Sequence, residues 1–156
     1  MKGNQIFLSS CGVKIDEKKR FMIPSSFRKI LEMKGAKEIY AFSSFINSCV
    51  EVCTVERINK FYEFLENMEM FSPQRDAIAT AVLADCESIQ IDSRGRIMLP
   101  DRLMEFANLK EEALFVGKGL TFEIWNRDNF DNYYKKAKEI AKNSSFMRGR
   151  VNENPQ

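Results

Sequence analysis

The sequence predicts an α+β fold built from two copies of one short unit of strand, loop, strand and helix. Two observations support this prediction. The segment 13–24 aligns without a gap to the segment 89–100, and five of the twelve positions are identical. In both segments, apolar residues that alternate with polar ones precede a basic loop, and apolar residues at helical spacing follow a proline. We therefore expect a duplication in which each copy adds two further strands after its short helix.

Each copy begins with a hairpin of two strands. In the second copy, Ile89 and Ile91 alternate with polar neighbours, which is typical of a half-buried strand. Asp92 can accept backbone hydrogen bonds across the following turn, and Gly95 can adopt a positive φ at little cost. The next residue, Arg96, is therefore expected at the loop exit. Identical residues link this hairpin to the first copy: Ile15 with Ile91, Asp16 with Asp92, Arg20 with Arg96, Met22 with Met98, and Pro24 with Pro100.

The loop of the first copy departs from this pattern at one position. Lys19 stands where the second copy has Gly95. A side chain at positive φ is strained by about 1 kcal/mol or more. We therefore expect either a different turn in the first loop or an ordinary backbone conformation at Lys19.

A proline marks the start of a short helix in each copy. Pro24 precedes Ser25 and Ser26, Pro100 precedes Asp101, and these polar side chains can cap exposed amides. The helical faces have i, i+3, i+4 spacing and consist of Phe27, Ile30 and Leu31 in the first copy and of Leu103, Phe106 and Ala107 in the second. Farther on, the segment 50–53 matches the segment 122–125, and both are expected to be strands.

Further helices are expected between the copies and after the second one. Thr54 can cap one helix, Ser72 and Pro73 can start another, and Asp128 can cap a final helix with a lysine-rich surface. We interpret the apolar stripes of these helices as core. The expected organisation is a first repeat domain at 10–57, a helical connector at 58–85, a second repeat domain at 86–129, and a C-terminal helix with a loose tail at 130–156.

Composition excludes several classes of function. The chain has no histidine, which rules out histidine-based catalytic triads and zinc hydrolase sites. No paired-acid, nucleophile-base or phosphate-loop pattern is present, so we expect neither an enzyme nor a cofactor. The four cysteines lack a second Cys-x-x-Cys pair, and we interpret them as buried or half-buried apolar residues rather than metal ligands. No apolar run has the length of a signal peptide core or a membrane span, so we expect a cytoplasmic protein.

Charge is distributed unevenly along the chain, although the net charge is only +2. Residues 14–37 contain eight Lys or Arg against three acids, whereas residues 38–92 contain three against ten. Residues 93–156 contain twelve against nine. The chain is therefore charge-segregated, with a basic first block, an acidic middle and a mildly basic end.

These features resemble the MraZ family, whose pattern is two copies of an Asp-x-Lys-Gly-Arg-like loop followed by an apolar stretch and proline, each within a SpoVT-AbrB-type domain. The resemblance covers residues 10–142. It is most specific in the second copy, through Ile91-Asp-Ser-Arg-Gly-Arg-Ile-Met-Leu-Pro100, Leu114-Phe-Val-Gly-Lys-Gly119 and Phe122-Glu-Ile-Trp125. The turn and motif residues that match the family pattern are Asp16, Pro24, Asp92, Gly95 and Pro100.

The resemblance implies a duplicated swapped-hairpin β-barrel with flanking helices, in which the two repeats form a pseudo-twofold unit. It also implies a nucleoid-associated transcription regulator that forms a ring-like homo-oligomer. Such a protein would bind repeated promoter elements in double-stranded DNA upstream of the division and cell-wall gene cluster. The alternative is an antitoxin-like module that grips a partner protein, although such antitoxins usually carry only one domain of this type.

The first loop is the preferred candidate for DNA contact. Lys18, Lys19 and Arg20 form a compact cationic tip that can meet phosphate oxygens, and Arg20 can also form a bidentate contact to a guanine edge. Arg94 and Arg96 hold the corresponding places in the second copy. They either do the same or are held by acidic residues within the barrel or at a subunit interface.

Other basic residues near the loops are weaker candidates for DNA contact. Lys14, Arg28 and Lys29 lie on predicted strand or helix surfaces, where isolated bases are common. We interpret them as residues that steer DNA toward the loops.

Overall fold

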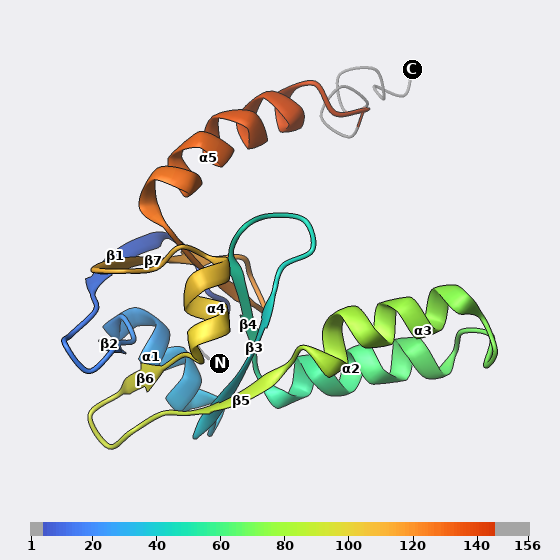
Figure 1. Ribbon diagram of the computed structural model, residues 1–156, viewed down its shortest axis with the longest axis horizontal. Helices are drawn as coiled ribbons and strands as arrows, with labels where there is room; N and C mark the ends of the chain where they lie inside the picture. The colour runs from blue at the N-terminus through green and yellow to red at the C-terminus, as the bar shows by residue number, and fades with distance from the viewer. Residues whose placement is uncertain (1–4, 146–156) are drawn as a thin grey trace, which may run out of the picture. The chain divides into compact units, whose positions relative to one another are not determined.

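The computed structural model describes residues 5–145. The chain up to Asn126 forms one compact unit, and the part from Arg127 on forms a second. Within the first unit, each repeat folds in the expected order of strand, strand, helix, strand and strand (Figure 1). The predicted α+β fold class is confirmed, and the strands of the sheet are antiparallel.

The two copies contain equivalent elements of similar length. The first copy consists of β1 (Ser10–Lys14), β2 (Arg20–Met22), α1 (Ser25–Met33), β3 (Glu38–Ser43) and β4 (Val50–Cys53). The second consists of β5 (Glu87–Gln90), β6 (Arg96–Met98), α4 (Asp101–Phe106), β7 (Glu112–Gly117) and β8 (Phe122–Trp125). Between them lie α2 (Val55–Glu66), α3 (Pro73–Ala79) and a π-helical turn, η1 (Thr80–Ala84).

Both copies contribute to one six-stranded antiparallel sheet with the order β1-β7-β8-β4-β3-β5. The first strand of each copy pairs with the other copy, because β1 lies against β7 and β5 lies against β3. The strands β2 and β6 form a separate antiparallel pair. The strands within residues 5–145 form no closed sheet, so barrel closure stays a prediction.

The core is a cluster of aromatic rings from both copies. Phe27 packs on Phe122 at a centroid distance of 5.2 Å, and Phe21 packs edge-on against Phe115 at 5.9 Å. Each fully buried phenylalanine contributes about 1.5–3 kcal/mol through the hydrophobic effect. Phe7, which precedes the repeats, lies 4.9 Å from Phe122 in the same cluster. This shared core makes the folding of one copy depend on the other.

Phe7 reaches the core because the backbone around it lies close to β7. Its amide donates to the Gly119 carbonyl at 2.7 Å, and the Gly119 amide donates back at 2.9 Å. A Cβ at Gly117 would stand 2.4 Å from the Phe7 carbonyl carbon, so this position requires glycine. Both glycines belong to the segment 114–119 that matches the family pattern.

The helices α2 and α3 form a hairpin that extends away from the sheet (Figure 1). Ser72 caps α3 as predicted, because its hydroxyl accepts from the Gln74 and Arg75 amides at 3.2 and 3.3 Å. Arg75 joins the two helices by donating to the Leu65 carbonyl at 2.9 Å. Thr54 occupies the cap position of α2 but makes no side-chain capping bond, so that part of the prediction is wrong.

The second unit contains α5 (Arg127–Lys142). Asp128 lies inside its first turn rather than at the predicted cap. Phe130 and Tyr134 are in contact at 5.8 Å, and the Lys138 ammonium lies 5.1 Å from the Tyr134 ring centroid. No residue of this helix is buried. The expectation that its apolar stripe belongs to the core is therefore wrong. The predicted loose tail lies mostly outside the described residues.

Two further expectations concern cysteines and membranes. Cys49 and Cys53 are buried and Cys86 is half-buried, as predicted, but Cys11 is exposed on the edge strand β1. The interpretation of all four as buried or half-buried residues is therefore wrong for Cys11. None of the helices within residues 5–145 is both long and apolar enough to cross a lipid bilayer.

Candidate nucleic-acid interface

The two hairpin loops share one hydrogen-bonding pattern. In the first loop, the Asp16 carboxylate accepts from the Lys18 and Arg20 amides and from Arg20 Nε, each at 2.9 Å. The Asp16 carbonyl accepts from the Lys19 amide at 3.0 Å, which closes the turn. Since both backbone and side-chain oxygens of one aspartate are used, that residue fixes the conformation of the whole loop.

The second loop repeats these bonds. Asp92 accepts from the Arg94 amide at 2.9 Å, from the Arg96 amide at 2.8 Å and from Arg96 Nε at 2.8 Å. The Gly95 amide donates to the Asp92 carbonyl at 3.0 Å. Asp92, an acidic residue of the same loop, holds Arg96 through Nε, and contact of Arg96 with DNA stays a prediction. Arg20 is held in the same way.

The conformation of Lys19 overturns the expectation for the first loop. Lys19 has φ +62°, in the left-handed region, and Gly95 has φ +80°. The first loop therefore adopts the same turn as the second, despite the missing glycine. The backbone strain at Lys19 is offset by the Asp16 hydrogen bonds and by an exposed ion pair between Lys19 Nζ and Asp101 at 2.9 Å.

Each loop packs against the helix of the other copy. Asp101, the partner of Lys19, is the first residue of α4. Arg28 of α1 covers the second loop, where its Nη1 lies 3.4 Å from the Arg94 carbonyl. A Cβ at Gly95 would stand 2.4 Å from Arg28 Cδ. Arg28 is therefore a packing residue of the second loop, and our interpretation of it as a surface base that steers DNA is wrong.

The pair β2–β6 connects the two loops as a short ribbon. Its register places Arg20 opposite Met98, Phe21 opposite Ile97, and Met22 opposite Arg96. Because side chains alternate between the faces of a strand, Phe21 and Ile97 point into the core, where both are buried. The opposite side of the ribbon, which we call the outer face, carries Arg20, Met22, Arg96 and Met98.

The electrostatics of the loops keep the outer-face arginines in place. The Arg20 amide is the main cause that lowers the pKa of Asp16 below its ordinary value, against an opposing effect of desolvation. The Arg96 amide lowers the pKa of Asp92 in the same manner. Both carboxylates therefore remain ionised at neutral pH. Among residues 5–145, the Nη groups of both arginines make no hydrogen bond, so they are available to an external acceptor.

The remaining predicted site residues lie around the ribbon. Lys18, Lys19 and Arg94 are exposed at the loop tips, and Lys14 is exposed at the end of β1. Lys29 is exposed on α1.

Pro24 and Pro100 occupy the cap positions of α1 and α4, as expected for helix starts. Their neighbours do not cap these helices through side chains, so the predicted capping by Ser25, Ser26 and Asp101 is wrong. Asp101 instead pairs with Lys19.

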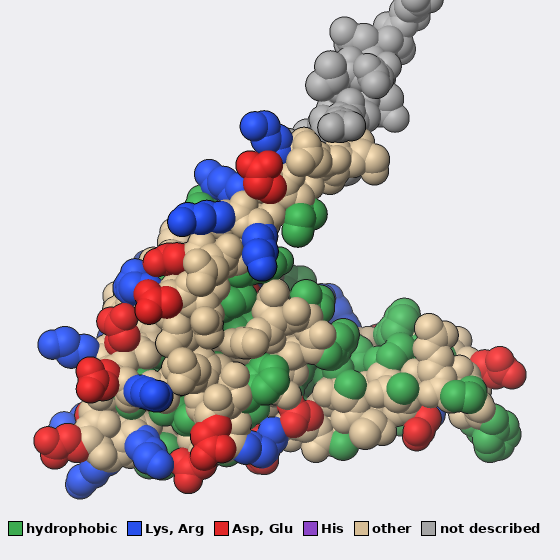
Figure 2. Space-filling model, turned by 45° about the horizontal axis from the view of Figure 1, so that its top comes forward, with side chains coloured by type: hydrophobic (Ala, Val, Ile, Leu, Met, Phe, Trp, Pro, Cys, Tyr) green, Lys and Arg blue, Asp and Glu red, His purple; other side chains and the backbone are tan. Residues whose placement is uncertain are grey.

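Surface character differs between the two ends of the first unit. Figure 2 shows charged side chains of both signs over the end with the loops and hydrophobic side chains gathered over the α2–α3 hairpin. The methionines of the outer face are exceptions, and the sequence alone identified them only as identical positions of the two copies. Side chains alternate between the two faces of a strand. If Phe21 and Ile97 are expected to be buried, this alternation identifies Met22 and Met98 as exposed residues.

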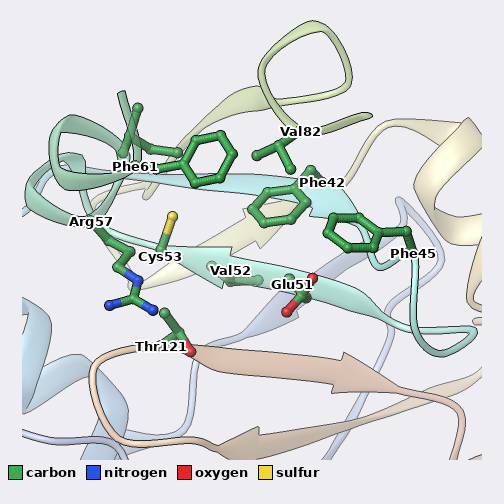
Figure 3. A pocket seen from close by; sticks show the side chains of 10 residues that line it. Phe42, Phe45, Glu51, Val52, Cys53, Arg57, Phe61, Val82 and Thr121 are labelled. Atoms are coloured by element: carbon green, nitrogen blue, oxygen red, sulfur yellow. The ribbon is translucent and has the colours of Figure 1, made fainter. Parts of the chain in front are cut away.

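A separate pocket of about 250 Å³ lies beside α2 and β4. Figure 3 shows that Phe42 and Phe61 line it together with Glu51, Arg57 and Cys53. Burial raises the pKa of the Cys53 thiol to about 12, which keeps it protonated and unreactive. The lining therefore offers no activated nucleophile. In residues 5–145, no three Cys, Asp or Glu side chains come together as a potential metal site.

Comparison with known families matches residues 82–150 to the family described as "MraZ protein, putative antitoxin-like". A protein named transcriptional regulator MraZ from Rickettsia canadensis (strain McKiel) is 37% identical over 136 residues, which cover 87% of this chain and 91% of the relative. The protein of that name from Rickettsia rickettsii (strain Sheila Smith) gives the same identity and coverage. That from Rickettsia akari (strain Hartford) is 35% identical over 141 residues, covering 90% of this chain and 95% of the relative.

Proposed function

Because the chain belongs to the MraZ family and its relatives are transcription regulators, we propose that it binds double-stranded promoter DNA sequence-specifically through the β2–β6 ribbon. One observation carries this proposal. Two equivalent arginines, Arg20 and Arg96, lie on the outer face of a two-stranded ribbon, and an aspartate orients each of them. A ribbon of this kind fits the major groove of B-DNA.

The ribbon and its loops provide two kinds of contact. Lys18, Lys19 and Arg94 at the loop tips suit phosphate oxygens, which fix position but carry no sequence information. Arg20 and Arg96 suit the O6 and N7 atoms of guanine, because their Nη groups are available while Nε is bound to the loop aspartate. Because the aspartate already holds the guanidinium before DNA binds, less conformational entropy is lost on binding.

We further propose that the two repeats, at 10–57 and 86–129, form a pseudo-twofold swapped-hairpin barrel. Exchange of each strand with its equivalent turns the order β1-β7-β8-β4-β3-β5 into its own reverse. The β4–β8 register is also symmetric about the equivalent residues Glu51 and Glu123, which lie directly opposite each other. This symmetry supports one DNA-contacting loop at each end of the ribbon.

Self-association follows from the small number of contacts that one chain can make. Two loops engage few phosphates, so we propose that several copies assemble and bind adjacent repeats of a promoter element. The α2–α3 hairpin supports this assembly because Met70 and Phe71 are 73% and 90% exposed.

We propose that α5 of a second copy covers this apolar tip. Residues 55–85 contain six acids against three bases, whereas α5 contains five bases against three acids. The two elements are therefore complementary in charge and both present apolar side chains. A ring is the closed form of such a head-to-tail contact.

The proposed DNA is a set of repeated promoter elements upstream of the division and cell-wall gene cluster, which places the protein on the nucleoid. The test measures binding to a duplex from upstream of the protein's own gene by fluorescence anisotropy. We expect Arg20→Ala to weaken binding by about 10-fold to 100-fold. Lys60→Ala, which removes an exposed base from α2, should leave the affinity unchanged.

Two results would contradict the proposal: wild-type affinity in an assembled Arg20→Ala protein, or binding that does not weaken as salt increases. The antitoxin-like family description favours a second candidate function, the gripping of a partner protein. A stoichiometric second protein that co-purifies with the chain, together with no DNA binding, would support that function instead.

A further inference from the structure

The outer face of the ribbon contains two apolar side chains that phosphate or guanine contacts do not use. Met22 is 40% exposed and Met98 is 53% exposed, although both lie in strands that contribute to the core. Each methionine stands directly opposite an arginine on the neighbouring strand. The four side chains therefore form two crossed diagonals, one of arginines and one of methionines.

These methionines are not required by the core. The inward positions of the same strands are filled by Phe21 and Ile97, which are 1% and 2% exposed. A polar side chain at the outward positions would keep the ribbon soluble at no cost in packing. Instead, both repeats place a flexible and polarisable apolar group between two guanidinium groups.

Resting on the proposed DNA-binding function, we propose that Met22 and Met98 contact the C5 methyl groups of thymines in the major groove. The methyl group is the apolar feature of that groove, and it distinguishes thymine from the other bases. The recognised element then contains thymine close to each guanine that an arginine contacts. The methionines are thus specificity-determining residues of the same interface.

Strand geometry limits where these thymines lie. Arg20 and Met22 are two residues apart on β2, as are Arg96 and Met98 on β6. Two residues of a strand span about 7 Å, and two base-pair steps of B-DNA also span about 7 Å. Each thymine is therefore expected within about two base pairs of its guanine.

Nucleic acid fits this surface better than a second protein. The methionines are bordered by Arg20 and Arg96 and by the loop-tip bases Lys18, Lys19 and Arg94. An apolar protein surface would bury these charges without partners, which is costly. A DNA groove offers base acceptors and phosphates for the charges and methyl groups for the methionines.

The experiment compares two selections by the full-length protein from random duplex libraries. One library contains thymine, and the other contains uracil in its place, which keeps base pairing and removes only the C5 methyl group. We expect enriched duplexes in the thymine library to contain guanines with a fixed thymine nearby. In the uracil library the guanines should persist while the preference at the neighbouring position disappears.

Variants assign the effect to the methionines. The double variant Met22→Ala with Met98→Ala should select the same guanines from the thymine library without the neighbouring thymine. Met22→Leu with Met98→Leu keeps an apolar contact and should retain the preference. Met33→Ala, which removes an exposed methionine from α1, serves as the matched control and should select as the wild type does.

A single selected duplex provides the quantitative check. Replacement of the fixed thymine by uracil should weaken wild-type binding about fourfold, since a buried methyl group contributes about 0.8 kcal/mol. The alanine double variant should bind both duplexes equally.

The outcomes separate the inference from the function on which it rests. Guanine enrichment by the wild type without any difference between the two libraries would overturn the methionine proposal and leave sequence-specific DNA binding standing. A thymine preference that persists in the alanine double variant would also overturn it. No enrichment from either library would contradict both proposals.

Discussion

At the scale of single residues, one aspartate organises each hairpin loop. The carboxylates of Asp16 and Asp92 each accept from two backbone amides and one guanidinium of their own loop. This explains why Lys19 adopts φ +62° where a glycine is usual. The aspartate hydrogen bonds set the turn, and glycine only lowers its conformational energy.

Gly95 is the residue where backbone strain and packing act together. Gly95→Ala should lower the free energy of unfolding by about 2 kcal/mol, because a Cβ at positive φ is strained and also meets the Arg28 side chain. The measurement is urea unfolding followed by circular dichroism.

Two control variants separate these causes. Gly119→Ala has the same strain, with φ +88°, but its Cβ would have no heavy atom within 4 Å, so it should cost only about 1 kcal/mol. Lys19→Ala should cost less still, because that position already carries a side chain at positive φ. An equal loss for Gly95→Ala and Gly119→Ala would show that the contact with Arg28 is unimportant.

Glu51 makes the folded state less stable as the pH rises. Burial, and next the charge of Glu123 directly opposite, raise the pKa of Glu51 above its ordinary value of 4.5. Ser44, Lys118 and Arg57 act in the opposite direction. The folded state thus holds the proton more tightly than the unfolded state, and the associated stability is lost as pH rises through the folded pKa. Glu51→Gln should therefore raise the urea midpoint at pH 7.

Glu38→Gln is the matched control with the opposite sign. The Tyr40 hydroxyl is the main donor that lowers the pKa of Glu38, with Ser88 and Gln90 adding to it. That stability is present above the ordinary pKa of 4.5 and is lost as pH falls through the folded pKa. Glu38→Gln should lower the urea midpoint at pH 7. A lower midpoint for both variants would contradict the assignment of Glu51.

At the scale of elements, the ribbon and the α2–α3 hairpin differ in the interactions that stabilise them. The ribbon is attached to the core through Phe21 and Ile97, so the side chains of its outer face are not needed for packing. The hairpin has little buried surface, since Leu65 is the one buried residue of α2 and α3 has none. Its stability therefore depends on caps and on the bonds that Arg75 makes to the Leu65 carbonyl and to Glu66.

Ser72→Ala should destabilise α3 by about 1 kcal/mol, because it removes the hydroxyl that accepts from two amides of the first turn. Hydrogen exchange of amides in residues 73–79 measures this loss locally. Thr54→Val is the control, since Thr54 makes no capping bond and valine has a similar shape. Equal protection in Ser72→Ala and wild-type protein would contradict the role of the cap.

At the scale of the whole molecule, the first strand of each repeat pairs with a strand of the other repeat. These strand pairs join the two repeats. Neither copy can complete the sheet alone, and the aromatic core includes Phe27 from the first copy and Phe122 from the second. The two hairpin loops are consequently held in one fixed relation by the ribbon between them. In the assembly that we propose, each further chain would add another unit with two loops.

Phe71→Ser should shift the protein toward smaller species, because Phe71 is 90% exposed at the hairpin tip where we propose that a second copy docks. Light scattering coupled to size-exclusion chromatography gives the mass. Met33→Ser, which changes an exposed methionine on α1, should keep the wild-type mass. If Phe71→Ser also keeps it, the hairpin tip is not the contact surface.

Much of the element order could be predicted from the sequence, because a hairpin, its turn and a helix start are encoded within a dozen neighbouring residues. The alternation around Ile89 and Ile91, the Asp92 turn and the proline before each short helix are local signals of this kind. The same signals located the cationic loops and Ser72 as a cap. They failed at Asp101 and Arg28, whose partners are 82 and 66 residues away.

The sequence by itself thus determined the two copies, their order of elements and the basic loops, since these depend on contacts between near neighbours. Only the tertiary structure decided which strands exchange between the copies, how α1 and α4 pack on the opposite loops, and that Lys19 takes a left-handed conformation. It also placed Arg20, Met22, Arg96 and Met98 on one outer face. These features depend on pairing between distant segments, which local patterns do not specify.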